Sequence, residues 1–123
     1  MKSILRLSIL SVLVCAIPAF AASPEDEKLK KEGFKILSPA QVRQAFTGKR
    51  FTDDVHFSYT YNAGGAIEGT SMGKKQTGSW VIREQKLCVT DSFGETCYVV
   101  WKKGAEVRLA FGQSDLTLDG FLR

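Results

Sequence analysis

A change of hydrophobic period near Arg50 constrains the fold of this chain more than any other feature. From that point onward apolar residues recur at every second position in short stretches, and glycines separate the stretches. Both signs are typical of half-buried β-strands joined by turns. In the clearest stretch, 55–62, one face carries Val55, Phe57, Tyr59 and Tyr61, and the other carries His56, Ser58, Thr60 and Asn62. We therefore expect a mainly β domain.

Six further stretches extend the same pattern with weaker individual signals. They are 66–72, 77–83, 87–90, 96–102, 106–111 and 114–122, and the last is expected to turn Leu116 and Leu118 inward. The pattern predicts six to eight short strands, which is typical of a small antiparallel β-barrel or a strongly bent sheet. An open sheet of six strands packed on a helix is the alternative.

One short N-terminal helix is expected before the strands, because its start signal is complete. Ser38 and Gln41 stand three residues apart and form a capping box, with a proline at the first helical position. Val42 and Phe46 then recur at helical spacing, and Gly48 supplies a stop. A helix of about nine residues is not stable alone. We expect the side that carries Val42 and Phe46 to pack on the sheet.

The chain begins with a predicted signal peptide, residues 1–21. Lys2 and Arg6 precede an apolar run over 9–17, and Ala19 and Ala21 give the pattern at which signal peptidase cuts. The run is shorter than the roughly 20 residues of a membrane-spanning helix. An uncleaved anchor is thus the less favoured alternative, and no transmembrane segment is expected in the mature chain.

The mature chain is expected to hold one domain. Residues 22–36 are predicted to form an N-terminal arm, whose charged part, 23–31, is expected to be solvated or a frayed helical turn. Residues 37–123 are about the length of a single domain, and no repeat or linker interrupts them. We therefore predict a single β domain over 37–123.

Two of the three cysteines are expected to form a disulfide. Cys15 belongs to the apolar run of the leader, which leaves Cys88 and Cys97 as a pair. If these residues face one another in a hairpin, its turn centres on Ser92-Phe93. Opposed Cα atoms about 4.5 Å apart suit a disulfide. Leader and disulfide together predict a periplasmic or secreted protein.

The charge distribution does not indicate nucleic-acid binding. Removal of the leader takes two of the 17 basic residues and leaves 15 against 13 acidic residues. The basic pairs at 49–50, 74–75 and 102–103 stand apart at expected turns and strand ends. Phosphate binding depends on clustered Lys and Arg, so we expect no nucleic-acid partner.

The chain is poor in groups that carry catalysis or bind metals. His56 is its only histidine, and Asp54, which would share its strand face, adds one carboxylate. Zinc requires three or four ligands. The segment with Gly64 and Gly69 has the glycine spacing of a phosphate-binding loop, but it lacks the lysine that such a loop carries after its second glycine. We predict no catalytic residue, no metal and no cofactor, with His56 at the surface.

Aromatic residues are the remaining candidates for a site. Phe57, Tyr59, Tyr61, Trp80 and Trp101 are expected to line the inside of a barrel or one face of a sheet. Core packing is the simpler explanation. The functional alternative is a pocket for a small apolar ligand, because such pockets combine aromatic walls with few polar groups. The candidate ligand-binding residues are Tyr59, Tyr61 and Trp80, the tyrosines first because a buried hydroxyl needs a partner.

The order of short motifs resembles a family of small, uncharacterised secreted proteins of Gram-negative alphaproteobacteria. The motifs are Leu37-Ser38 with Val42, Gly48-Lys49 with Phe51, Gly78-Ser79-Trp80, Leu87-Cys88, and Gly94 with Cys97-Tyr98. In that family a short helix precedes a β domain with G-x-W and two cysteines. The resemblance implies a periplasmic or secreted location and the disulfide, and it implies no active site.

These observations favour a non-enzymatic binding or interaction module outside the cytoplasm. Its partner is expected to be an unknown protein or a small apolar ligand. A structural or stress protein of the cell envelope is the alternative, and a small enzyme comes third because no catalytic constellation is visible.

Overall fold

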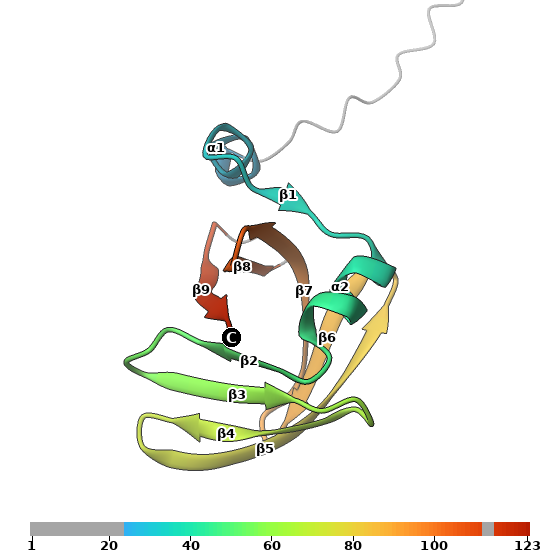
Figure 1. The fold of residues 1–123 in the computed structure, drawn as a ribbon, viewed down its shortest axis with the longest axis vertical. Helices are drawn as coiled ribbons and strands as arrows, with labels where there is room; N and C mark the ends of the chain where they lie inside the picture. Colours follow the sequence, from blue (N-terminus) through green and yellow to red (C-terminus); the bar gives the residue numbers. More distant parts are fainter. Residues whose placement is uncertain (1–23, 112–114) are drawn as a thin grey trace, which may run out of the picture.

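The computed structural model describes residues 24–111 and 115–123, so the predicted signal peptide and Cys15 lie outside the described residues. Eight antiparallel strands close into a barrel, and a ninth strand and two short helices are attached to it (Figure 1). The barrel strands are β2 (Lys49–Thr52), β3 (Phe57–Tyr61), β4 (Ala66–Ser71), β5 (Lys74–Arg83), β6 (Lys86–Asp91), β7 (Gly94–Lys103), β8 (Glu106–Phe111) and β9 (Thr117–Leu122). Each strand pairs with the next, and β9 pairs with β2. The structure thus confirms the mainly β prediction and selects the barrel over the open sheet.

The alternation of apolar residues produces the barrel core. Phe51, Leu87, Val100 and Leu109 come from four different strands and are completely or almost completely buried in one cluster. Successive side chains on a strand point to opposite faces, so the residues between them turn outward. The rule also assigns outward positions to Cys88 and Cys97, whose neighbours Leu87 and Tyr98 pack on the core.

Two glycines allow neighbouring strands to approach closely where the barrel bends. A Cβ at Gly69 would collide with the backbone of Ser58 on β3, and a Cβ at Gly78 would collide with the carbonyl oxygen of Thr90 on β6. Glycine is the residue that permits such an approach in a strand. These positions therefore let β4 and β5 curve tightly enough to close the barrel.

Helix α2 (Pro39–Phe46) closes one end of the barrel, as expected from its sequence. Ser38 Oγ accepts from the Gln41 N–H, and Gln41 Oε1 accepts from the Ser38 N–H, which completes the capping box. Val42 and Phe46 are fully buried in the barrel core. The helix is thus held by the side chains that it inserts, because eight residues give little stability of their own.

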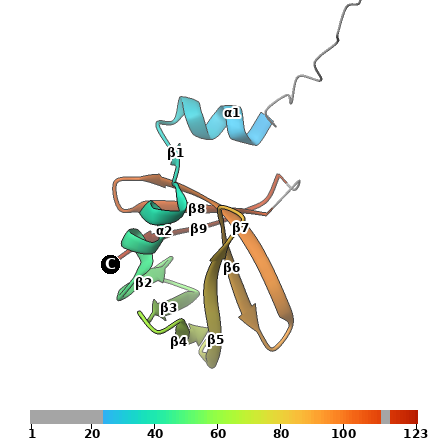
Figure 2. The same ribbon diagram turned by 90° about the vertical axis from the view of Figure 1, so that its right-hand side faces the viewer.

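The N-terminal segment packs on the outside of the barrel and is not a solvated arm. Helix α1 (Pro24–Lys31) lies above the barrel (Figure 2). Strand β1 (Lys35–Ile36) pairs with β7 beyond the part of β7 that pairs with β6. Leu29 and Phe34 form a second small core with Trp101 and Ala110. The expectation that Trp101 lines the barrel is therefore wrong, because its strand position faces outward.

The end of the barrel opposite α2 is formed by the β2–β3, β4–β5, β6–β7 and β8–β9 connections. Each connection carries one exposed large apolar side chain, and the four are Val55, Met72, Phe93 and Leu116. We call this the loop end. The strand predicted to begin at Val55 begins at Phe57 instead, and Leu116 does not point inward as predicted.

No helix in the described part of the chain is long and apolar enough to span a membrane.

Candidate functional site

A cavity of about 120 Å³ lies inside the barrel, in the half nearer the loop end. Its apolar wall includes Ile67, Val89, Leu109 and Leu118, which come from four different strands. An apolar cavity of about 150 Å³ is large enough for benzene. This space therefore suits a ligand of about one ring, which is smaller than the ligands of most protein pockets.

Three of the six polar residues that line the cavity are tyrosines. Tyr59, Tyr61 and Tyr98 line it together with Gln76, Thr77 and Asp91. Burial raises the pKa of Tyr61 above its ordinary value of 10.0, and the neighbouring hydroxyls of Tyr98 and Tyr59 raise it further. Burial also raises the pKa of Tyr98, although a hydrogen bond with Thr96 opposes the change. At neutral pH the hydroxyls of Tyr61 and Tyr98 are uncharged and can both donate and accept hydrogen bonds.

The structure brings two of the three candidate ligand-binding residues to this cavity. Tyr59 and Tyr61 line it, whereas Trp80 lies behind Tyr61, with ring centroids 5.7 Å apart. The Trp80 indole N–H donates to the Asn62 carbonyl oxygen at 2.9 Å, so it is not available to bond a ligand. Phe57 stacks on Tyr59 and completes the aromatic row predicted on β3.

Sequence reasoning missed Tyr98 and Asp91 as members of the cavity. Both could have been found from the predicted hairpin. Cys88 pairs with Cys97 in the expected register, and alternation then turns Leu87 and Tyr98 to the other face of the sheet. The same rule places Asp91 on the inward face of β6. The signal was present, but it required knowing that the disulfide lies outside the barrel.

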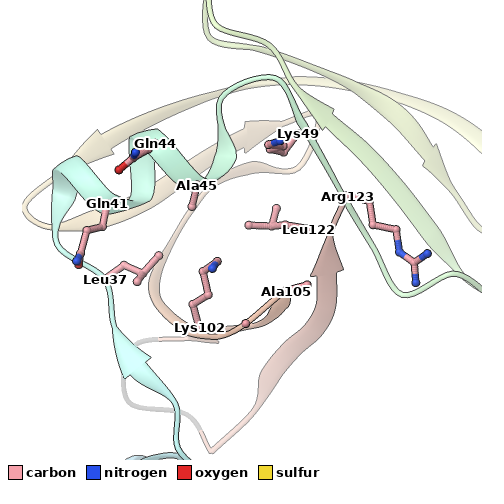
Figure 3. A pocket seen from close by; sticks show the side chains of 10 residues that line it. Leu37, Gln41, Gln44, Ala45, Lys49, Lys102, Ala105, Leu122 and Arg123 are labelled. Atoms are coloured by element: carbon pink, nitrogen blue, oxygen red, sulfur yellow. The ribbon is translucent and has the colours of Figure 1, made fainter.

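A second hollow lies at the α2 end, outside the barrel core. It is an open groove of about 550 Å³ between α2, the β7–β8 turn and the end of β9 (Figure 3). Leu37, Ala45, Ala105 and Leu122 give it an apolar floor. We call this the helix-end groove. Its polar lining consists of Gln41, Gln44, Lys49, Lys102 and Arg123.

All charged side chains that line the helix-end groove are positive, because none of the lining residues is Asp or Glu. Arg123 already has an ion-pair partner, because its guanidinium lies 2.6 Å from Asp54 Oδ2. Its side chain points away from the floor of the groove (Figure 3). Lys102 is half-buried and points toward the floor (Figure 3). Among the ion pairs of the described residues, none involves Lys49 or Lys102.

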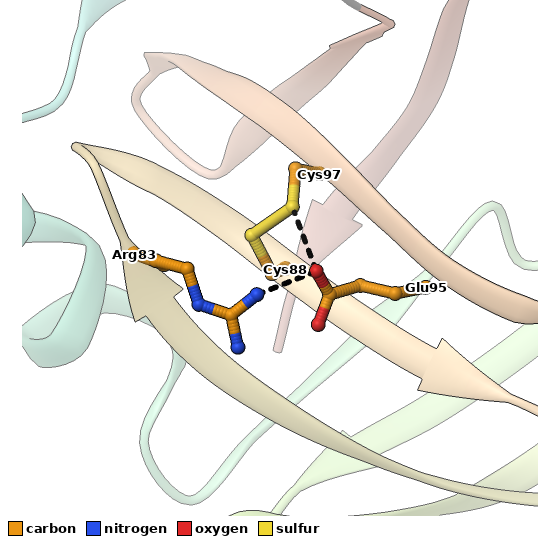
Figure 4. Close-up of a disulfide and its surroundings, with 4 residues drawn as sticks. All are labelled: Arg83, Cys88, Glu95 and Cys97. Carbon is orange, nitrogen blue, oxygen red and sulfur yellow. Dashed lines mark hydrogen bonds and ion pairs between the residues drawn. A yellow bond between two sulfur atoms is a disulfide. The ribbon is translucent and has the colours of Figure 1, made fainter.

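The disulfide joins β6 and β7 on the outer face of the barrel (Figure 4). The Cα atoms of Cys88 and Cys97 are 4.0 Å apart, which confirms the predicted pairing. Arg83 donates to Glu95 at 2.6 Å beside the sulfur atoms. In the described part of the chain, the potential metal ligands that cluster are Cys88, Glu95 and Cys97. Their two sulfurs are joined to one another, so this cluster gives no metal site in the oxidised protein.

The histidine lies in a loop and not on a strand. Asp53 Oδ1 accepts the backbone N–H groups of Val55, His56 and Phe57, and its Oδ2 lies 2.7 Å from His56 Nδ1. The expected shared face of Asp54 and His56 is therefore wrong, because Asp53 is the partner of His56. The His56 side chain is 62 % exposed, as predicted for a surface residue.

The described residues thus form a cavity inside the barrel, a groove at the α2 end and a disulfide on the outer face. No family model, curated protein or solved structure matches this chain. The resemblance to the alphaproteobacterial family stays a prediction. Any functional argument therefore rests on the residues of the two hollows.

Proposed function

We propose that this protein is an exported, non-enzymatic binding module whose ligand is a small, largely apolar molecule held in the barrel cavity. The observation that carries the proposal is that three tyrosines and four aliphatic side chains line one space inside the barrel, together with Gln76, Thr77 and Asp91. Such a combination of an apolar wall and a few polar groups is typical of ligand sites. The predicted leader and the disulfide support a periplasmic or secreted location.

The size and chemistry of the cavity define the ligand class. About 120 Å³ admits a single ring or a short branched chain. The hydroxyls of Tyr59, Tyr61 and Tyr98 can pair with one polar substituent, such as a hydroxyl or a carbonyl. A small phenol satisfies both requirements.

The lining favours binding over catalysis. Its titratable groups are three tyrosines and Asp91, and it contains no histidine, lysine or cysteine. Proton transfer or nucleophilic chemistry needs an activated base or nucleophile in contact with the ligand. The tyrosines whose pKa is raised are held in the neutral form and therefore act as hydrogen-bonding groups.

The proposal is tested with 4-fluorophenol as the probe and the full mature chain, followed by fluorine NMR. We expect the wild type to bind the probe, and 4-fluorotoluene to bind more weakly because it lacks the hydroxyl. Val89→Phe fills the cavity and should weaken binding at least tenfold. Val81→Phe makes the same change at an exposed position of β5 and should leave binding unchanged.

Tyr59→Phe keeps the shape of the wall and removes one hydroxyl, so it covers the case in which Val89→Phe fails to fold. We expect it to weaken binding of 4-fluorophenol more than binding of 4-fluorotoluene. Equal binding of both probes to all variants, or no binding to the wild type, contradicts the proposal. The export part is tested separately, by the mass of the protein recovered from the periplasm after loss of residues 1–21.

A further inference from the structure

The helix-end groove combines an apolar floor with a cation that has no partner. Leu37, Ala45 and Leu122 are partly buried, and Lys102 lies between them in the space that they enclose (Figure 3). The stem of a lysine can lie along apolar surface while its ammonium group stays hydrated. The ammonium group of Lys102 forms no ion pair with a side-chain carboxylate of the described residues, so it is available to an anion that enters the groove.

The strand register increases the positive charge at this place. Lys35 of β1 pairs directly with Lys102 of β7. Like charges directly opposite one another in a sheet are destabilising. Lys49 adds a third ammonium group at the other side of the groove. An anion bound here would relieve this repulsion.

The side chains of Glu106, Asp119 and Asp54 do not form ion pairs with these lysines. Glu106 and Asp119 pair with Arg108 on the outer face of the barrel, at 3.4 and 3.5 Å. Asp54 pairs with Arg123. Each of these acids is thus engaged by an arginine, and the lysines of the groove keep their charge available.

We propose that the helix-end groove binds a carboxylate with a short hydrocarbon chain. The carboxylate lies against Lys102, and the chain covers Leu37, Ala45 and Leu122. The volume of about 550 Å³ is in the range of small-molecule sites. The site differs from the barrel cavity, because the two hollows share no lining residue.

Octanoate is the probe, and its binding to the full mature chain is measured by isothermal titration and by NMR shifts of backbone amides. We expect shifts at Leu37, Ala45 and Leu122, and not at Tyr59 or Tyr98. Octanol should bind at least tenfold more weakly, because it has no charge. Acetate should also bind at least tenfold more weakly, because it has no chain to cover the floor.

Lys102→Met keeps the length of the side chain and removes its charge. We expect it to weaken octanoate binding at least tenfold and to lower the salt dependence. Lys103→Met is the matched control, since Lys103 is the next residue of β7 and faces the opposite side. It should bind octanoate like the wild type.

Several outcomes would overturn the inference. They are equal binding of octanoate to Lys102→Met and to the wild type, equal binding of octanol and octanoate, and amide shifts confined to the barrel cavity. Binding of an acidic peptide without binding of octanoate would assign the groove to a protein partner instead. Failure of 4-fluorophenol to bind affects only the proposed function and leaves this inference intact.

Discussion

Gly78 shows how a single missing Cβ lets the barrel close. Its α-hydrogen faces the carbonyl oxygen of Thr90 on the neighbouring strand, and there is no room for a methyl group. We expect Gly78→Ala to lower the free energy of unfolding by about 2 kcal/mol, since overpacking against neighbouring atoms costs that much. Urea denaturation followed by tryptophan fluorescence measures the change.

Gly64→Ala is the control for this substitution. Gly64 lies in a turn, and a Cβ there meets no atom within 4 Å. The same chemical change should therefore alter the free energy of unfolding by less than about 0.5 kcal/mol, as for most surface substitutions. Equal effects of the two alanines would show that backbone freedom and not the close contact with β6 governs both sites.

Asp53 organises the β2–β3 loop, and its titration has a predictable effect on stability. Burial opposes ionisation of its side chain, but the N–H groups of Phe57, Val55 and His56 and the imidazole outweigh it and hold the pKa below the ordinary value of 3.8. A carboxyl group whose pKa is lowered by folding stabilises the folded state above the pKa of the unfolded chain. That contribution is present at neutral pH and falls as the pH drops below about 4.

Asp53→Asn tests this account, because the amide keeps the shape and does not titrate in this range. We expect the variant to be less stable than the wild type at pH 7, and the difference to shrink steadily as the pH falls from 4 to 2. Denaturant unfolding at several pH values gives the curve. A difference that stays constant over this range would mean that the charge of Asp53 contributes nothing to the loop.

At the scale of the element, the disulfide fixes the β6–β7 hairpin. The two cysteines are nine residues apart, and closing a loop of this size removes about 2.5 to 3 kcal/mol of unfolded-state entropy. We expect the Cys88→Ser/Cys97→Ser double variant to lose about that much stability. The oxidised wild type should weigh two hydrogens less than its reduced form by mass spectrometry. Free thiols on Cys88 and Cys97 in the protein purified without reductant would contradict the pairing.

Helix α1 depends on the barrel for its stability. Its sequence is mostly charged, and Leu29 is its buried residue. Leu29 packs with Phe34, Trp101 and Ala110, and the Arg108 guanidinium lies 4.9 Å from the centre of the Phe34 ring. We expect Leu29→Ala to cost about 2 to 3 kcal/mol if the helix folds cooperatively with the barrel.

Lys30→Ala, at an exposed position of the same helix, should leave stability unchanged. Amide hydrogen exchange distinguishes two outcomes for Leu29→Ala. Loss of protection in residues 24–34 alone would show that α1 unfolds without the barrel. Loss throughout the barrel would show that the second core belongs to one cooperative unit.

At the scale of the whole molecule, the alternating pattern located seven of the eight barrel strands, but it located neither β2 nor the segments that cover the barrel. The alternation around Tyr59 and the register of Cys88 with Cys97 depend on local rules, and both are confirmed. Trp101 was placed inside because it is aromatic, although it faces α1 outside. The local pattern in 24–31 does not predict that Leu29 packs against Trp101, because this contact joins residues 72 positions apart and depends on tertiary packing.

At the loop end, the predicted start of a strand at Val55 was wrong for a different reason. Val55 continues the period of Phe57 and Tyr59 by coincidence, and the hydrogen bonds of Asp53 hold it in a loop. Of the candidate site, Tyr59 and Tyr61 were predictable from alternation, whereas the helix-end groove was not. Lys102 and Leu122 lie far apart in sequence and meet only because β9 closes the barrel beside α2.

Burial of Tyr61 in the closed barrel makes the stability of the fold sensitive to alkaline pH. Burial and the neighbouring tyrosines raise the pKa of Tyr61 above 10.0, so the folded state keeps a proton that the unfolded chain loses above about pH 10. The raised pKa of Tyr98 acts in the same direction. Stability should therefore be constant up to about pH 9 and fall above pH 10, by at most about 1.4 kcal/mol per pH unit for each suppressed ionisation.

Tyr61→Phe removes one of these ionisations and keeps the packing of the ring against Phe46 and Trp80. We expect its free energy of unfolding to fall less steeply than that of the wild type between pH 10 and 12, with equal slopes between pH 6 and 8. Urea unfolding at each pH gives the slopes, and ultraviolet absorbance of tyrosinate gives the ionisation of the folded protein. If Tyr61 ionised near pH 10 in the folded barrel, both measurements would show it, and water would then have to reach its hydroxyl through the cavity.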